Sequence, residues 1–488
     1  MSLLTNRSLL RAIVLAALVA SPVQADELLV SAGNSEIVFD TRAAVPIRWT
    51  ICATQCADSD HKSVLLAEDD GYFHITTPAG SAGDFSAAVE ELADEVVVNF
   101  RGAHGNYIYR LSREEARVQV ELPSQASIEF ATGDVFVPEQ LPGFGQIYSR
   151  VKAVQVSDAG QNVYEQPEDL PAELTANETV WSGIRNRYWT LLARTDAETS
   201  SPFQLTEPDH PVVQLTANDA DSPALFEFYA GPVEWRTLKQ VSPELSEMLF
   251  AALWDFLRLL CFGMLLLLEW LQTAVGSFGL AIVLLSLSNK ILMSPLTMLA
   301  DRWQADVNRQ HSLLKPELDE IKQSYKGEEA HKRVLKVYEK HGVSQLYTFK
   351  SAAGFLIQIP VFIAAFDMLA ENIALNEIAF LWVSDLAKPD HVLELPFVLP
   401  FFGGWLNLLP FLMTALSALA AWLQAEDTLT AELQRQQSIR LYLMSAAFFL
   451  LFYTFPAGMV LYWTSSNLFH LLKVESGRLF ARFSSPRD

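Results

Sequence analysis

The distribution of apolar residues divides the chain into two parts. Up to about residue 242, short stretches alternate between apolar and polar residues, as in EVVVNF, NYIYRLS, ARVQVEL and RYWTLLAR. Clusters of Gly, Pro, Asn and Asp separate these stretches, which is typical of strands joined by turns. A segment of about 215 residues can bury one sizeable core. We therefore expect residues 26–242 to form an all-β, β-sandwich-like domain.

Long apolar runs replace this alternation in the second part. Four runs approach the roughly 20 residues that a helix needs to cross a bilayer. Pro456 and Gly458, in the stretch TFPAG, divide the last run into two helices. The sequence therefore predicts an α-helical transmembrane core at 276–488 in a multi-domain membrane protein. Its five spans lie at about residues 276–296, 353–369, 406–423, 439–455 and 457–473.

Residues 248–270 form a further apolar run, but they include Asp255, Arg258 and Glu269. Hydropathy alone leaves their position open. The segment 298–350, between the first two spans, is rich in Lys and Arg, as cytoplasmic loops are. If 248–270 crossed the membrane, this basic segment would lie on the same side as the β domain. We therefore place residues 243–275 as an amphipathic helix at the outer interface.

The basic segment 298–350 has a helical pattern of its own. Apolar residues recur at three- and four-residue spacing from Val307 to Tyr325, and a second helix follows the turn sequence YKGEE. This pattern predicts a cytoplasmic helical hairpin. A connector between adjacent spans needs only a few residues, so the length favours a docking surface over a solvated linker.

The N-terminus indicates export. Residues 1–25 combine Arg7 and Arg11 with a short apolar stretch and a small-residue cleavage pattern, VQA. This is typical of a cleaved signal peptide, although an uncleaved N-terminal anchor fits as well. In an oxidising compartment, Cys52 and Cys56 are candidates for a disulfide, with two free thiols as the alternative. Further Cys or His residues at ligand spacing are missing from their surroundings, so we expect no metal site.

Charge and motifs exclude some functions. The formal net charge of −22 argues against binding nucleic acid, which needs a basic surface. The sequence contains no phosphate-binding motif such as a Walker A sequence and no metal-ligand spacing among its His residues. We therefore expect no cofactor.

Lys290 lies inside the first predicted span. At about 1.5 Å per residue, it is roughly 10 Å from the cytoplasmic end of that span. It could extend its amine to the interface, or it could face a hydrated cavity. Polar residues of all five spans lie at a similar depth, which favours a hydrophilic groove in the inner leaflet with Lys290 as its central cation. The predicted groove residues are Lys290, Asn289, Ser286, Gln358, Thr414, Ser417, Ser445, Ser465, Ser466 and Asn467.

Several stretches resemble the YidC-type membrane protein insertases of the Oxa/Alb superfamily. They are NKILMSPLT, LLKPELDEI, FLIQIPVFIAAFDML and FPAGMVLYWTSSNLF, in this order. FYAGPVEWRTLK and GIRNRYWTLLAR resemble that family's periplasmic domain. The sequence departs from the family where it carries Lys290 in place of an arginine and Asp367 in place of an aromatic residue. Where many members have a first transmembrane anchor, this sequence has a segment that resembles a cleavable signal.

The resemblance implies a membrane protein insertase and chaperone rather than an enzyme. It would lie in the bacterial inner membrane, with its N-terminal domain in the periplasm and its C-terminus in the cytoplasm. Nascent inner-membrane proteins and the lipid bilayer are the implied partners, and the Sec translocon and the ribosome are candidates. Client helices would pass a hydrophobic slide, which we define as Phe362, Phe366, Phe448, Phe449 and Phe452.

Three other functions stay open. A divergent paralogue with specialised clients would share all these features. An intramembrane protease could use Ser286, Ser288 or Ser466 with Lys290 as the base. A transporter would need similar polarity near the middle of the membrane, but we find no inverted repeat in the sequence.

Overall fold

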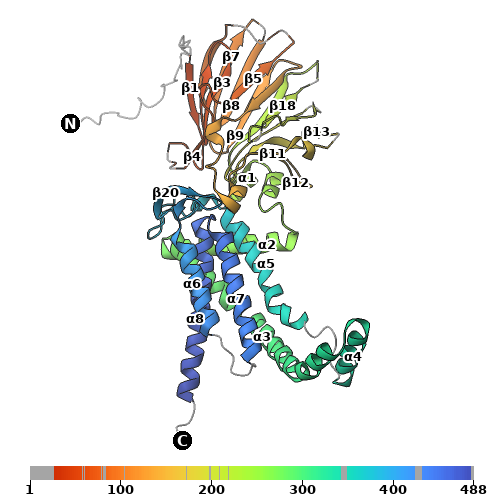
Figure 1. Cartoon of the computed structure of the whole chain (residues 1–488). Helices are drawn as coiled ribbons and strands as arrows, with labels where there is room; N and C mark the ends of the chain where they lie inside the picture. The colour runs from red at the N-terminus through yellow and green to blue at the C-terminus, as the bar shows by residue number, and fades with distance from the viewer. Residues whose placement is uncertain are drawn as a thin grey trace, which may run out of the picture.

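The computed structural model describes residues 27–341, 349–423 and 431–484, apart from positions 58, 60, 79, 81–83, 104, 172, 178, 197–198, 208 and 218. The predicted signal peptide therefore lies outside the described residues. Figure 1 shows a β-rich region stacked on one end of a group of helices, with a helical hairpin projecting near the other end. The two parts follow each other along the chain, as the apolar pattern predicts.

Within its described residues, the β-rich region has three large antiparallel sheets of four, four and nine strands. The first has the order β1 (Glu27–Ala32), β2 (Ser35–Asp40), β3 (Val45–Cys52) and β4 (Lys62–Leu66). The second has the order β17 (Phe203–Gln204), β18 (Val212–Thr216), β10 (Ser127–Ala131) and β5 (Tyr72–Thr76). The third has the order β12 (Gly160–Tyr164), β11 (Lys152–Ser157), β14 (Trp181–Arg185), β15 (Trp189–Thr195), β19 (Ala224–Pro232), β9 (Arg117–Leu122), β8 (Gly105–Ser112), β7 (Glu95–Gly102) and β6 (Ser86–Glu91).

Alternation along the strands produces the core of this region. In β9 the apolar residues Val118, Val120 and Leu122 are buried, while the polar residues between them are partly exposed. Side chains alternate across a strand with a period of two, so this pattern places one face of the sheet against the core. The four stretches quoted from the sequence correspond to β7, β8, β9 and β15, which confirms them as strands. The short pair β13 (Thr175–Ala176) and β16 (Thr199–Ser200) lies apart from the large sheets.

The structure joins Cys52 and Cys56 by a disulfide at the end of β3. Both residues are buried. Cys261, the remaining cysteine, is a buried free thiol in the helical region.

In the described parts of the chain, eight α-helices follow or connect the sheets. They are α1 (Trp235–Val241), α2 (Asp255–Val275), α3 (Phe278–Ser324), α4 (Gly327–Lys340), α5 (Phe349–Glu371), α6 (Leu408–Leu423), α7 (Ala431–Phe452) and α8 (Ala457–Ser484). In Figure 1, α6, α7 and α8 run along the long direction of the molecule, whereas α2 lies across their ends below the sheets. The short 3₁₀ helices are η1 (Asp134–Phe136), η2 (Gly143–Tyr148), η3 (Pro167–Asp169), η4 (Pro243–Met248) and η5 (Ile373–Leu375).

Local sequence fixes two breaks between helices. Gly276 ends α2 in the left-handed conformation, with a φ of 70°, and the Ser277 side chain accepts a hydrogen bond from the Leu280 N–H at the start of α3. Pro456 precedes the first residue of α8 and separates it from α7, where the stretch TFPAG predicts a turn. Both breaks lie where the sequence places them.

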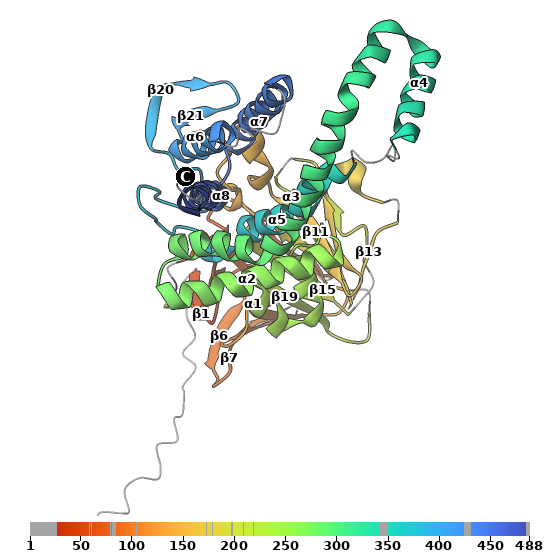
Figure 2. The ribbon, with the colours of Figure 1, turned by 90° about the horizontal axis from the view of Figure 1, so that it is seen from below.

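The predicted hairpin differs from the structure in one respect. The first span and the first arm of the hairpin form one continuous helix, α3, of 47 residues, although it contains Pro295 and Pro316. Figure 2 shows the far end of α3 and the antiparallel α4 extending away from the other helices. The two arms pack through buried Val307, Leu314, Leu318 and Val337. The predicted apolar spacing therefore describes the seam between the two arms.

Length and composition identify two helices in the described part of the chain that could cross a membrane. They are Asp255–Val275, which is α2, and Phe278–Val307 of α3. The apolar helices Leu408–Leu423 and Ser438–Phe452 are shorter. Residues 248–270, which loop charge assigns to the interface, thus overlap a helix that passes the test for a span.

A two-stranded hairpin precedes α6, between the second and third predicted spans. Its strands are β20 (Leu393–Leu399) and β21 (Gly403–Leu406), and the pairing is irregular between Glu394 and Leu399. The sequence does not predict this hairpin because Pro396 and Pro400 lie in it or next to its strands, and proline is uncommon inside strands.

Candidate functional site: a polar cavity around Lys290

A cavity of about 730 Å³ lies among α3, α5 and α8. Its residues come mainly from one face of α3 and one face of α8, with Gln358 and Val361 from α5. The lining residues are Ser286, Leu287, Asn289, Lys290, Ile291, Met293, Ser294, Thr297, Asp301, Gln358, Val361, Tyr462, Ser466, Phe469, His470, Leu472, Lys473 and Ser476. Hydroxyl, amide and charged groups thus converge between helices that are otherwise apolar.

Helical spacing explains why these residues share a wall. On α3, Ser286, Lys290, Thr297 and Asp301 are separated by four, seven and four residues. Residues at these separations lie on one face of a helix. On α8, the series Tyr462, Ser466, Phe469, Lys473 and Ser476 follows the same rule. The two polar faces turn toward each other across the cavity.

Lys290 is the lysine that α3 contributes to the cavity lining. Its Nζ donates a hydrogen bond to Ser466 Oγ over 3.1 Å. Among the residues that the structure describes, Lys290 has no carboxylate within ion-pair distance. The amine is half-buried and turned to the cavity, so its charge is available to a polar or acidic group that enters.

The neighbouring polar residues fall into two kinds. Asn289 is buried and donates from Nδ2 to the Tyr462 hydroxyl over 3.1 Å, which ties α3 to α8 beside Lys290. Ser286 is also buried, and its Oγ has no hydrogen-bond partner among the residues that the structure describes. A buried hydroxyl without a partner costs free energy, and this one lines a cavity large enough for water. These contacts are consistent with a hydrated interior.

The structure brings five of the predicted groove residues into this lining: Ser286, Asn289, Lys290, Gln358 and Ser466. The other five lie outside it: Thr414, Ser417, Ser445, Ser465 and Asn467. The hydroxyls of Thr414, Ser417 and Ser445 each donate to the backbone carbonyl four residues earlier in their own helix. Asn467 donates to Ser417 Oγ over 2.7 Å and thereby links α8 to α6.

Sequence reasoning missed several polar residues of the lining. These are Ser294, Thr297, Asp301, Tyr462, His470, Lys473 and Ser476. Extending the four- and seven-residue spacing from Lys290 along α3, and from Ser466 along α8, would have found most of them. The sequence prediction chose residues by their expected depth in the membrane. It did not consider which side of each helix the residues occupy.

The hydrophobic slide residues form a packed aromatic group. Phe362 lies 5.6 Å from Phe366 and 6.1 Å from Phe452 between ring centroids, and Phe448 lies 5.3 Å from Trp463. Phe452 is 1% exposed, so it supports the other rings from within. Phe449 instead packs on Phe411 of α6. The group joins α5, α7 and α8. Because Phe452 is buried, it is not part of the surface that a client helix could contact.

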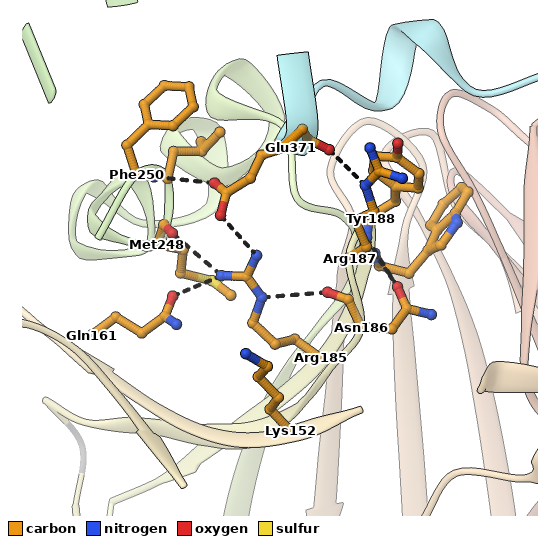
Figure 3. Close-up of polar contacts among 12 residues, drawn as sticks. Lys152, Gln161, Arg185, Asn186, Arg187, Tyr188, Met248, Phe250 and Glu371 are labelled. Carbon is orange, nitrogen blue, oxygen red and sulfur yellow. Dashed lines mark hydrogen bonds and ion pairs between the residues drawn. The ribbon is translucent and has the colours of Figure 1, made fainter. Parts of the chain in front are cut away.

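A second polar cluster holds the β-rich region on the helices (Figure 3). Arg185 at the end of β14 is buried, and it donates from Nη1 to Gln161 Oε1 over 2.9 Å and to the Met248 carbonyl over 3.3 Å. Its Nη2 lies 3.8 Å from Glu371 Oε1 at the end of α5. Glu371 also accepts from the Phe250 N–H over 3.1 Å. One ion pair thus connects the sheet, α5 and the loop before α2.

Arg187 makes the neighbouring connection. Its Nε and Nη1 donate to the carbonyls of Ala370 and Ala387 over 2.6 Å and 2.8 Å. The guanidinium lies 4.8 Å from the Tyr148 ring and 4.6 Å from the Tyr188 ring. Burial raises the pKa of Tyr188 to about 12, so this phenol is neutral at physiological pH. The cluster is therefore a junction of cations with fixed protein partners.

Asp367 and a second cavity lie beside this junction. The cavity has a volume of about 540 Å³, and its wall includes Lys152, Arg185, Asp367 and Glu371. Asp367 is thus on the β-domain side of α5, away from the cavity around Lys290.

No group of three or more His, Cys, Asp or Glu residues arranged to hold a metal ion occurs in the part of the chain that the structure describes. The Cys52–Cys56 pair is disulfide-bonded and supplies no thiolate ligand. The lining of the Lys290 cavity itself presents hydroxyl, amide, amine, imidazole and carboxylate groups.

Residues 270–475 match the family model described as 60Kd inner membrane protein. The chain is 26% identical to the membrane protein insertase YidC of Chlorobium luteolum, over 61% of this chain and 51% of that protein. It is 26% identical to the YidC of Chlorobaculum parvum, over 63% and 52%, and 28% identical to that of Prosthecochloris aestuarii, over 50% and 40%.

This chain spans about half the length of the first two of these relatives. A crystal structure of an active YidC insertase, with its first transmembrane domain resolved, is 18% identical and has a TM-score of 0.36, over 92% of each chain. The family match covers all residues that line the Lys290 cavity except Ser476. The sequence similarity to these relatives agrees with the resemblance drawn from the quoted stretches.

Proposed function

We propose, from the premise that residues 270–475 belong to the 60Kd inner membrane protein family, that this chain inserts proteins into the bacterial inner membrane and helps them fold. The proposal is supported by the names of its relatives, all membrane protein insertases. The observation that carries it is Lys290, a cation in a polar cavity with a serine hydroxyl as its hydrogen-bond partner.

The cavity explains how such a protein lowers the cost of insertion. A polar segment that crosses about 30 Å of hydrocarbon loses the water around its backbone and side chains. A hydrated cavity in the inner leaflet shortens the dry distance. The charge of Lys290 then attracts acidic residues in the client segment that must cross. Removing the charge should therefore impair acidic segments more than neutral ones.

The proposed topology uses five spans: the first part of α3, then α5, α6, α7 and α8. The β-rich domain lies in the periplasm, α2 lies at the outer interface, and the α3–α4 hairpin and the C-terminus lie in the cytoplasm. Figure 1 supports this arrangement, because the β-rich region and the hairpin project from different ends of the helical region. The basic composition of residues 298–350 supports a cytoplasmic hairpin.

Clients in this proposal are nascent inner-membrane proteins. The hairpin offers a docking surface for them. The partly buried rings Phe362 and Phe448 of the hydrophobic slide guide their apolar helices. The Sec translocon and the ribosome are candidate partners. The sequence lacks a Walker A motif, so hydrophobic partitioning and the membrane potential drive the step.

One contact also favours a second candidate, a Ser/Lys protease. The 3.1 Å distance from Lys290 Nζ to Ser466 Oγ is what a lysine base would need to activate a serine. Against this reading, Ser466 lies inside α8, where neighbouring backbone N–H groups are used by the helix. An oxyanion hole needs such donors to be free. We therefore rank the protease second.

The direct test is site-specific photo-crosslinking to a stalled nascent chain that carries one membrane span. A crosslinker at Gln358, on the cavity wall, should capture the client. Leu412 on α6, which is 38% exposed and outside the cavity lining, serves as the matched control position. Crosslinks at Leu412 and none at Gln358, with both variants at equal protein level, would contradict insertion through this cavity.

A further inference from the structure

The β20–β21 hairpin exposes apolar side chains on both of its faces. Phe397 is 58% exposed and its neighbour Val398 is 78% exposed. Successive side chains of a strand point to opposite faces, so neither face of β20 is covered at this point. Leu393, at the start of the strand, is 57% exposed. A water-exposed strand would normally keep polar residues on at least one face.

The hairpin is held firmly in this exposed position. Phe402, in its turn, packs on Tyr453 with 4.9 Å between ring centroids, and the Tyr453 hydroxyl donates to the Trp405 carbonyl over 3.0 Å. Phe401 packs on Phe144 of η2 at 5.0 Å. The contacts attach one part of the hairpin to the α7–α8 turn and the β-rich region. The apolar exposure is therefore a fixed feature of the fold.

Its location matches a membrane surface. In Figure 1 the hairpin lies beside the ends of the helices nearest the β-rich region, at about the level of α2. Exposed tryptophans occur at this level: Trp382 and Trp405 near the hairpin, and Trp254 and Trp270 at α2. Tryptophan is enriched where a membrane meets water. On α6, Phe411 and Leu412 are also 44% and 38% exposed.

We infer that the β20–β21 hairpin inserts its apolar side chains into the periplasmic leaflet, at the boundary between lipid headgroups and acyl chains. This inference rests on the proposed membrane topology. The hairpin thus anchors the junction between the β-rich region and the helices to the lipid surface. The residues of the hairpin that would contact lipid lie within 393–406.

Backbone hydrogen bonding limits how deeply the hairpin can enter the bilayer. A two-stranded sheet has open edges whose N–H and C=O groups lack partners, and leaving them unpaired in hydrocarbon costs several kcal/mol each. Headgroups and interfacial water satisfy these groups. The hairpin therefore lies shallow, with its side chains and not its backbone reaching the acyl chains.

A protein strand added to the hairpin edge is the competing occupant. Such pairing needs a regular ladder of donors and acceptors. Pro396 lacks an N–H, and the pairing of β20 is already irregular between Glu394 and Leu399. These features make the hairpin a poor template for another strand, whereas lipid needs no register. We therefore commit to lipid.

The test places an environment-sensitive fluorophore on single cysteines of the full-length protein in vesicles. Cys261→Ser removes the free thiol, and the Cys52–Cys56 disulfide does not react. The probe is attached at Val398→Cys. The matched control is Leu29→Cys on β1, which is 68% exposed on the β-rich region. Nitroxide-labelled lipids then report depth by quenching the fluorophore.

We expect blue-shifted emission at Val398 and severalfold stronger quenching than at Leu29, with a nitroxide near the headgroup more effective than one near the chain end. A third probe at Leu450→Cys, 47% exposed on α7, tests the membrane topology itself. Quenching at Leu450 without quenching at Val398 would overturn the hairpin inference and leave the topology standing. Absence of quenching at Leu450 would overturn the topology on which both depend.

Discussion

Two regions of this molecule hold buried or half-buried cations, and the two cations differ in how many protein groups they bind. At the junction below the β-rich region, Arg185 makes hydrogen bonds to Gln161 and Met248 and faces Glu371. In the cavity, Lys290 makes one hydrogen bond, to Ser466. The junction satisfies its cation with fixed partners, whereas the cavity leaves its cation available to a molecule from outside.

This difference predicts different effects of removing each cation. Removing one partner of a buried ion pair leaves the other charge uncompensated, which is strongly destabilising. Removing a cation that has no charged partner leaves no such charge behind. Arg185 should therefore matter for folding, and Lys290 for function.

The largest effect should come from Arg185→Met. This change leaves Glu371 without its ion-pair partner, and we expect the free energy of unfolding to fall by about 3 kcal/mol. Denaturant titration of the full-length protein, followed by tryptophan fluorescence, measures this loss. Arg150→Met is the control, because Arg150 pairs with Glu165 and has a side chain 43% exposed, where a loss below about 1 kcal/mol is expected. Equal losses would contradict the role assigned to the junction.

A smaller effect on stability should follow Lys290→Met. The change removes one hydrogen bond to Ser466 but relieves the burial of a charge, so we expect unfolding to shift by no more than about 1 kcal/mol. The same titration checks it. A loss as large as that of Arg185→Met would show that Lys290 is a structural residue, and the contrast would fail.

The smallest effect concerns Glu139 and Lys388, an exposed pair 2.9 Å apart on the two sides of the junction. The hydrogen bond from Lys388 lowers the pKa of Glu139. A lowered carboxyl pKa stabilises the fold above the unfolded value of about 4.3, and this contribution is lost as pH falls through the folded value. We expect Glu139→Gln to cost less than about 0.5 kcal/mol at pH 7 and nothing at acidic pH. A loss independent of pH would contradict the ion-pair origin.

The sequence predicts the helices and strands well where local pattern decides them. Alternation identified β7, β8, β9 and β15, and Pro456 located the break before α8. The apolar spacing from Val307 onward described the seam of the helical hairpin. In each case the signal is local, because side-chain periodicity follows directly from strand or helix geometry.

The site was predicted only in part, because it depends on how helices rotate against each other. The predicted depth in the membrane identified Lys290, Gln358 and Ser466 correctly, but it also selected Thr414 and Asn467. Thr414 donates a hydrogen bond to a carbonyl of its own helix, α6, and Asn467 donates to Met413 and Ser417 of α6. Asp301 and Lys473 were missed, although they continue the faces of Lys290 and Ser466. The partners of Arg185 were beyond prediction, since Glu371 is 186 residues away in the sequence.

The most direct test of the central claim compares Lys290→Arg with Lys290→Ala in cells that insert paired reporters with acidic and neutral translocated segments. Arginine keeps the charge and stays protonated, because its pKa exceeds about 12. We predict that Lys290→Arg inserts both reporters normally, whereas Lys290→Ala slows the acidic reporter about tenfold, equivalent to about 1.4 kcal/mol, and spares the neutral one. Loss of both reporters in Lys290→Arg, as complete as in Lys290→Ala, would contradict a role for charge alone and return the Ser466–Lys290 protease to consideration.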